Sequence, residues 1–217
     1  MISLKNSIQI LSIIFCLLGG EKLMAYEEPK YKVLEEYEEF EVREYSSYLV
    51  AETEIEGNFQ DVAKTAHRIL FEYISGNNVI REKMEMTTPV NQRNYESDGE
   101  KIEMTVPVQQ SAKLKSDGKF VVSFVVPSKY TMETIPVPKD PRVKIREIPK
   151  KIIAARKYSG RWTEENYREN EKILIEEIKK NKLEILSDAV YARYNPPFWP
   201  WFLRRNEVLI EIGSHYN

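Results

Sequence analysis

The sequence contains an internal duplication. Residues 40–57 (FEVREYSSYLVAETEIEG) align without a gap with residues 143–160 (VKIREIPKKIIAARKYSG), and the apolar positions of the two segments match. Each segment has the alternation of two strands and is followed closely by an aromatic residue and a helical pattern. We therefore expect two copies of one strand–strand–helix unit, over about residues 31–126 and 142–213. The identical positions are Arg43 with Arg146, Glu44 with Glu147, Ala51 with Ala154, and Gly57 with Gly160.

The hydrophobic periodicity predicts one helix in each copy, over about residues 60–75 and 164–181. Residues 119–126 (KFVVSFVV) are nearly all apolar, which is typical of a central strand. Neither copy alone has enough strands to bury both faces of a sheet. We therefore expect a single α+β domain with pseudo-twofold symmetry, in which the strands pack or close into a barrel and one helix lies outside each copy.

The composition excludes several classes of protein. Lys plus Arg (32) nearly balances Asp plus Glu (34), so the overall charge does not favour a nucleic-acid partner. The chain has one cysteine and two histidines, which argues against structural zinc sites, disulfide frameworks and cysteine nucleophiles. The motifs GxSxG, GxxxxGK[ST], HExxH and GxGxxG are absent, and no set of residues stands out as catalytic.

The N-terminus has the features of an export signal. Lys5 precedes an uncharged stretch, residues 6–20, whose apolar centre is too short for a spanning helix. We interpret residues 1–25 as a signal peptide, with Ala25 at an uncertain cleavage site, and residues 26–217 as one domain. This interpretation predicts a periplasmic or secreted protein. The alternatives are an uncleaved membrane anchor, or a start at Met24 with no export.

One flank of the first predicted helix is chemically distinctive. Successive residues of a helix lie 100° apart, which places Lys64, His67 and Phe71 together beside the apolar stripe that faces the core. A cation, an imidazole and a flat aromatic ring could hold a planar, acidic, hydrophobic ligand, with His67 available to a metal. The alternative is a surface histidine among neighbours that serve solubility.

Residues 194–205 (YNPPFWPWFLRR) form the second distinctive segment. Three prolines stiffen it, and it carries the large aromatic residues Phe198, Trp199 and Trp201. Such a loop either covers the core or forms the apolar wall of a binding site. Exposed tryptophans beside arginines also suit a membrane interface.

Taken together, the motifs resemble the SOUL haem-binding protein family. The resemblance covers nearly the whole chain after the signal and rests on segments in the family's order: FEVREY, YISGNN, KMEMTTPV, KIEMTVPV, YSGRW and YNPPFWPWFLRRNEV. It implies a twisted antiparallel β-barrel built from two repeats with two flanking helices.

The octapeptides at residues 83–90 and 101–108 alternate like half-buried strands, and we expect them to pair in the sheet.

The resemblance also implies a binding site. Family members bind haem or other tetrapyrroles in an apolar groove along the first helix, where Lys64 takes a basic position and His67 and Phe71 take groove-lining positions. Axial coordination of haem iron by His67 is a hypothesis particular to this sequence, because iron ligation is not a general feature of the family. Phe198, Trp199 and Trp201 are candidates for the same apolar site.

The main hypothesis is therefore an exported, monomeric haem- or tetrapyrrole-binding protein that acts as a carrier, buffer or sensor. A second hypothesis is an enzyme that modifies tetrapyrroles, for which the sequence names no residues. A third is a membrane or protein interaction module that uses the Trp-rich loop.

Overall fold

The structure is a computed structural model of the chain and describes residues 26–80, 99–112 and 118–213. Nine strands form one antiparallel sheet in the order β1-β2-β9-β11-β10-β5-β6-β3-β8, and β4 and β7 form a small second sheet. The strands are β1 (Tyr31–Glu36), β2 (Glu41–Tyr45), β3 (Tyr48–Glu56), β4 (Asn78–Val79), β5 (Val108–Ala112), β6 (Lys119–Val125), β7 (Val137–Pro138), β8 (Lys144–Ile148), β9 (Lys151–Tyr158), β10 (Val190–Arg193) and β11 (Asn206–Glu211).

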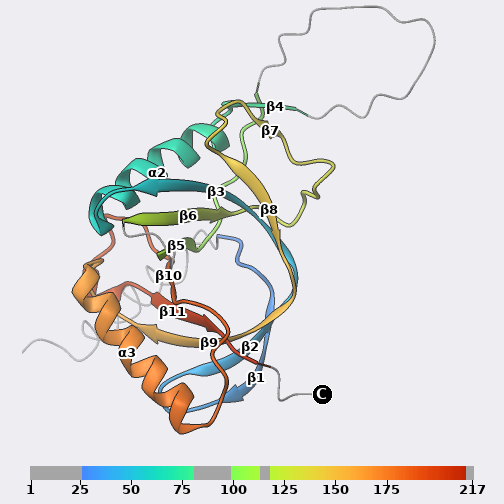
Figure 1. Cartoon of the computed structure of the whole chain (residues 1–217). Coiled ribbons are helices and arrows are strands. Elements are labelled where there is room, and N and C mark those ends of the chain that lie inside the picture. Colours follow the sequence, from blue (N-terminus) through green and yellow to red (C-terminus); the bar gives the residue numbers. More distant parts are fainter. Residues whose placement is uncertain (1–25, 81–98, 113–117, 214–217) are drawn as a thin grey trace, which may run out of the picture.

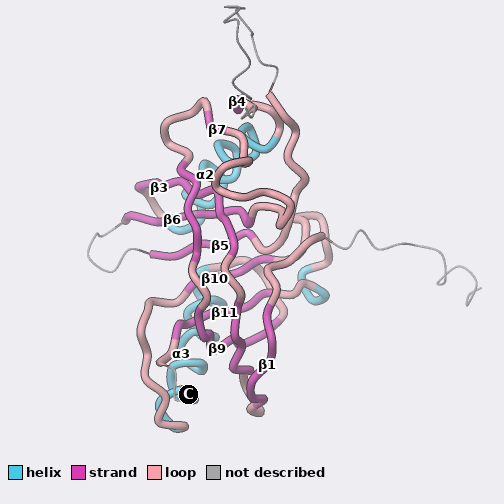
Figure 2. The backbone as a smooth tube through the Cα atoms, turned by 90° about the vertical axis from the view of Figure 1, so that its right-hand side faces the viewer, coloured by secondary structure: helices cyan, strands magenta, loops and turns pink. Residues whose placement is uncertain are grey.

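Two α-helices, α2 (Phe59–Ile74) and α3 (Glu164–Lys180), cover one face of the curled sheet. In Figure 1, α2 lies over β3 and β6 and α3 lies over β9 and β11, and these are the strands that each helix contacts most. Figure 2 shows the strands in front of both helices. The fold is therefore α+β, as predicted, but the sheet is an open half-barrel rather than the closed barrel that we expected, because the terminal strands β1 and β8 do not pair with each other in the described chain.

Both helices begin and end close to the predicted bounds. The Asn58 side chain accepts a hydrogen bond from the Asp61 backbone nitrogen (3.0 Å) and caps α2, and Thr163 caps α3 in the same way. Before each helix the chain turns at a glycine with positive φ, Gly57 (148°) and Gly160 (132°). The caps and turns fix where each helix starts, and the hydrophobic periodicity on which the predictions rested is equally local, so the sequence located both helices well.

The core lies between the sheet and the helices. The buried face of α2 contains Val62, Ala66, Ile69, Leu70 and Tyr73, which pack with side chains of β3 and β6. The buried face of α3 is carried by Tyr167, Leu174 and Ile178, over β9 and β11. The two sets belong to one hydrophobic cluster, so the helices share a core.

The octapeptides give a different result from the one expected. Residues 83–90 lie outside the described residues. In residues 101–108 only Val108 belongs to a strand. The backbone of this segment bonds elsewhere: the Ile102 nitrogen donates to the Ile74 carbonyl at the end of α2, and the Val106 nitrogen donates to the Glu27 carbonyl. The strand prediction for residues 101–107 was therefore wrong, because alternation cannot distinguish a strand from a segment anchored by such contacts.

The face of the sheet opposite the helices contains a buried ion network. The Glu207 carboxylate, which is 0% exposed, accepts hydrogen bonds from Arg43 (2.9 and 3.3 Å), Arg205 (3.0 Å) and the Tyr194 hydroxyl (2.7 Å). Arg205 also pairs with Glu28 (2.8 Å) in the N-terminal segment. The network thereby joins β2, β11 and the start of the described chain.

Candidate functional site

The predicted flank of α2 is exposed. Lys64, His67 and Phe71 all lie on the solvent side of the helix, and Phe71 is 47% exposed. The His67 ring stacks on the Phe71 ring (centroids 6.0 Å apart, planes at 16°) and also contacts Phe124 of β6 (5.4 Å). The structure therefore brings these three residues together as a flat, partly apolar shelf beside a cation.

The environment of His67 favours the neutral imidazole. Partial burial of its ring lowers the pKa of His67 below its usual value, and the positive charge of Arg193 lowers it further. A neutral imidazole has a nitrogen lone pair free to accept a hydrogen bond or to bind a metal. The shelf on α2 thus offers a possible ligand for a metal at neutral pH.

A row of side chains connects this shelf to the other helix. The strand register aligns Phe124, Val108, Arg193, Asn206 and Tyr158 across β6, β5, β10, β11 and β9. Directly paired residues point to the same face of a sheet, so this transverse row lies on the face that carries the helices. Val108, between Phe124 and Arg193, is half-buried, so the floor between them is not fully covered.

Arg193 occupies the centre of the transverse row. Its Nε donates to the Tyr167 hydroxyl (2.8 Å), and its Nη2 donates to Oε1 of Gln110 (2.7 Å). Its guanidinium lies 5.4 Å from the centre of the Trp162 ring, whose Nε1 donates to Asn206 (2.8 Å). Beyond the row, the helices meet through Tyr167, which packs against Phe59 at the start of α2 (5.3 Å).

The Trp-rich loop follows β10 and leads through a short 3-10 turn, η1 (Trp201–Leu203), to β11. Phe198 is 83% exposed and Trp201 is 49% exposed, whereas Trp199 is half-buried. Arg204 braces the loop by donating to the carbonyls of Trp199 (2.9 Å) and Pro197 (2.6 Å). The loop therefore does not cover the core.

The aromatic residues of this loop are not joined to the α2 shelf. In the described part of the chain, the ring of Trp201 contacts Phe202 and Arg161, and no ring contact of the loop reaches α2. Arg204 instead lies over Trp162, 4.3 Å from the ring centre. The connection between the loop and the transverse row therefore runs through Trp162. The assignment of Phe198, Trp199 and Trp201 to the ligand site stays a prediction, as does that of Lys64, His67 and Phe71.

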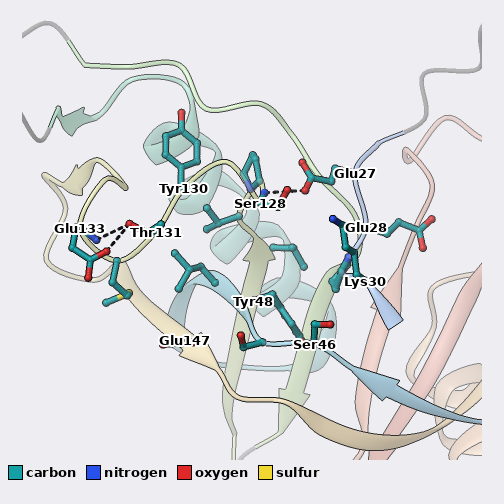
Figure 3. Close-up of a pocket in the computed structure, with 17 residues that line it drawn as sticks. Glu27, Glu28, Lys30, Ser46, Tyr48, Ser128, Tyr130, Thr131, Glu133 and Glu147 are labelled. Atoms are coloured by element: carbon teal, nitrogen blue, oxygen red, sulfur yellow. Dashed lines mark hydrogen bonds between the residues drawn. The ribbon is translucent and has the colours of Figure 1, made fainter. Parts of the chain in front are cut away.

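A cavity of about 470 Å³ lies at another place, between the N-terminal segment, the β2–β3 turn and the loop after β6 (Figure 3). Its volume is in the range of small-molecule sites. Four carboxylates border it, Glu27, Glu28, Glu133 and Glu147, against one cation, Lys30. This lining disfavours a ligand that carries carboxylates, and none of the lining residues belongs to α2.

Two further observations concern the described residues alone. These residues contain no group of three or more His, Cys, Asp or Glu side chains placed to hold a metal ion. Neither of their helices is long and apolar enough to cross a membrane.

The fold places the chain in a class of proteins built on a curled antiparallel sheet with two helices. The chain is similar to the EcmrR C-terminal domain (TM-score 0.56, 10% identity, 85% of this chain and 98% of that chain). It is also similar to EcmrR in its complex with DNA (TM-score 0.57, 11% identity, covering 97% of this chain and 67% of that chain). A third similar structure is a hydrolase from Listeria innocua (TM-score 0.50, 10% identity, covering 83% of this chain and 94% of that chain). At these identities the likeness concerns the fold alone.

Within this class, the sequence identifies the family. The family model described as SOUL heme-binding protein matches residues 26–211, which is most of the chain. The protein therefore belongs to the SOUL haem-binding family, whose ligands are haem and related tetrapyrroles. The comparison with curated protein sequences found no significant match to the chain.

The sequence interpretation missed the residues that surround Arg193. Gln110 is far in the sequence from Trp162 and Tyr167, and Arg193 is far from all three, so only the folded chain brings them together. One signal was present: Tyr191 and Arg193 are two residues apart on a strand, so a buried Tyr191 places Arg193 on the core-facing side.

Proposed function

We propose that this protein is a carrier, buffer or sensor that holds haem or a related tetrapyrrole on the exposed flank of α2. Family membership supports the ligand class. The observation that carries the location is the neutral, exposed imidazole of His67, stacked on Phe71 and close to the positive charge of Arg193.

The residues present fit such a ligand. Phe71 and the half-buried Val108 offer apolar surface to a flat ring, and Lys64 and Arg193 offer positive charge to its carboxylates. Bound haem would supply an iron centre, and His67 is the residue of the shelf that could ligate it through a ring nitrogen. The acidic cavity in Figure 3 has no histidine in its lining, and its glutamates outnumber its single lysine, so it does not suit an anion.

The test is a titration of the purified protein with haem, followed by the Soret band. We expect a saturable shift with a Kd of about 1 µM, which corresponds to about 8 kcal/mol. No saturable shift below about 100 µM, or roughly 5 kcal/mol, would refute the proposed function. His67→Ala should move the band of the complex. An unchanged band position with normal affinity would reject iron ligation by His67 but not the binding of haem.

Phe71 provides a second measurement of the location. Phe71→Ala removes about half of a phenylalanine's burial from the complex, which costs about 1 kcal/mol, or roughly a fivefold weaker Kd. Leu186→Ala is the matched control, because Leu186 is an exposed apolar residue that borders neither the shelf nor the transverse row. Equal affinities of the two variants would place the ligand elsewhere.

We further propose that residues 1–25 direct export and are removed, giving a periplasmic or secreted protein, with an uncleaved membrane anchor as the alternative. The start of the described chain supports a domain that begins near residue 26: the Ser46 nitrogen donates to the Lys30 carbonyl (3.0 Å), and Glu28 pairs with Arg205. The mass of protein isolated from the cell envelope tests this. A chain that retains residues 1–25 would contradict cleavage.

We also propose that the domain arose by duplication, that it is a monomer, and that it has no nucleic-acid partner. The pairing pattern supports a repeat, since β2 pairs with β9 and β3 pairs with β8, and both Gly57 and Gly160 turn the chain before a helix. The near balance of basic and acidic residues (32 and 34) supports the absence of a nucleic-acid partner.

A second candidate function is favoured by the Trp-rich loop. Phe198, Trp201, Phe202 and Leu203 are all exposed in a short braced segment, as in proteins that insert aromatic side chains into a membrane interface. Sedimentation with vesicles that contain anionic lipids tests this function. Binding that is lost in Trp201→Ser but kept in Lys64→Glu would support it, and no binding of the wild type would exclude it.

A further inference from the structure

The arginines of the described chain fall into two groups. Most of them form ion pairs with carboxylates: Arg43 and Arg205 with Glu207, Arg142 with Asp140, Arg146 with Glu52, Arg156 with Glu39, and Arg168 with Glu171. Four have no carboxylate partner among the described residues: Arg68 on α2, and Arg161, Arg193 and Arg204. The last three gather around two indole rings, those of Trp162 and Trp201.

Arg193 is the most constrained of the three. Its side chain is half-buried, and its two hydrogen-bond acceptors, the Tyr167 hydroxyl and the Gln110 amide oxygen, are both uncharged. Burial raises the pKa of Tyr167, so that phenol stays neutral at physiological pH. The positive charge of Arg193 is thus held in place by hydrogen bonds, and no carboxylate of the described residues neutralises it.

Arg204 and Arg161 extend this positive region towards the Trp-rich loop. Arg204 lies against the same indole as Arg193 and bonds only backbone carbonyls in the described chain. Arg161 lies over the ring of Trp201, 5.5 Å from its centre. The guanidinium group binds carboxylates in a planar, two-pronged geometry, and an aromatic ring behind it fixes its orientation.

A polar group without a partner lies close by. The Tyr158 hydroxyl is buried and has no hydrogen-bond partner among the described residues. Tyr158 belongs to the transverse row, and the charge of Arg193 acts on it. Buried hydroxyl groups normally have a partner, so the hydrogen bonding around Arg193 is incomplete among the described residues.

The distance between this region and the α2 shelf suits one ligand that spans both. His67 lies over Phe124, and the register places Arg193 two strands away from Phe124. Two strand spacings are about 10 Å, and the half-buried Val108 lies between them. A flat ring resting on His67 and Phe71 could therefore extend its acidic side chains towards Arg193.

We propose that Arg193 and Arg204, oriented by Trp162, form a carboxylate-binding site that receives the propionate groups of a tetrapyrrole bound on the α2 shelf. This inference rests on the proposed function and adds to it the residues that select for an acidic ligand. Arg193 acts as a specificity-determining residue, because a ligand without free carboxylates leaves its charge unneutralised.

The experiment compares haem with haem dimethyl ester, in which both propionates are capped, by Soret titration of the purified protein. The wild type should bind haem at least about tenfold more tightly than the ester, as expected for loss of a charge-assisted hydrogen bond. Arg193→Gln should reduce this ratio to within about threefold by weakening haem binding, with the affinity for the ester unchanged.

Matched variants separate this role from a general effect of charge or stability. Lys157→Gln removes one positive charge from an exposed position and should keep the wild-type ratio. Arg204→Gln changes a loop residue outside the core hydrogen bonds of Arg193 and should also lower the ratio, by several-fold, even if Arg193→Gln fails to fold. A wild type that binds haem and the ester equally would overturn the carboxylate site while leaving the proposed function intact. The same holds if Arg193→Gln and Arg204→Gln both keep the wild-type ratio of the two affinities. A wild type that binds neither ligand would refute both.

Discussion

The buried network around Glu207 gives a sharp prediction for Glu207→Ala. In the folded protein Arg43 is 2% exposed, and two of its nitrogens donate to the Glu207 carboxylate. Removing the carboxylate leaves a buried guanidinium whose remaining hydrogen-bond partners among the described residues are Glu41 (2.7 Å) and the Tyr45 hydroxyl (3.2 Å), beside the ring of Tyr31 (4.5 Å). Breaking a buried pair on one side costs about 3–5 kcal/mol. Since Glu41 remains, we expect the lower end, about 3 kcal/mol.

The assay is urea unfolding followed by circular dichroism. A loss of about 3 kcal/mol should lower the midpoint by roughly 1–2 M urea and the Tm by roughly 6–12 °C for a chain of this size. Glu52→Ala is the control, because it breaks an ion pair whose arginine, Arg146, is largely exposed and should cost less than about 1 kcal/mol. If Glu207→Ala costs no more than Glu52→Ala, the network does not hold β2 and β11 together and the reasoning is wrong.

Three further predictions concern the helices and His67. Asn58→Ala should lower the free energy of unfolding by about 1 kcal/mol, because it removes the cap of α2; an unchanged urea midpoint would contradict the capping role. Gly160→Ala should cost more than about 1 kcal/mol, since φ is 132° and a Cβ would lie 2.6 Å from the Asn166 side chain; unfolding at the wild-type temperature would show that the turn relaxes freely. The folded-state pKa of His67 lies below its unfolded value of about 6.5, so the unfolded chain takes up the proton first and stability falls as the pH drops below about 6.5. The free energy of unfolding should therefore decrease more between pH 7.5 and 5.5 in the wild type than in His67→Gln, and equal decreases would refute this.

Much of the fold could be predicted from the sequence because its signals are local. The apolar stripe located α2 within one residue, and the apolar run at residues 119–126 correctly indicated a central strand, β6, which lies between β5 and β3. Whether the sheet closes depends on the ends of the strand order, about which local patterns say nothing. The strand prediction for residues 101–107 failed for a related reason, since long-range backbone contacts decide their structure.

The candidate site was predictable only in part. Helical periodicity alone placed Lys64, His67 and Phe71 on one exposed flank. The position of Arg193 beside Gln110 depends on the pairing of β10 with β5. Its distance from His67 depends on a second pairing, that of β5 with β6. A single sequence contains no direct signal for such pairings, so the positive end of the proposed site emerged only from the fold.

The open sheet leaves two margins, β1 and β8, whose outer backbone groups have no neighbouring strand among the described residues. Such margins are natural templates for strand addition by another molecule, the first step towards fibres. Here both margins are charged: β8 exposes Lys144, Arg146 and Glu147, and β1 exposes Lys32 and Glu36. An approaching strand would have to desolvate these side chains, so the half-barrel can remain unclosed without recruiting further copies into an ordered aggregate.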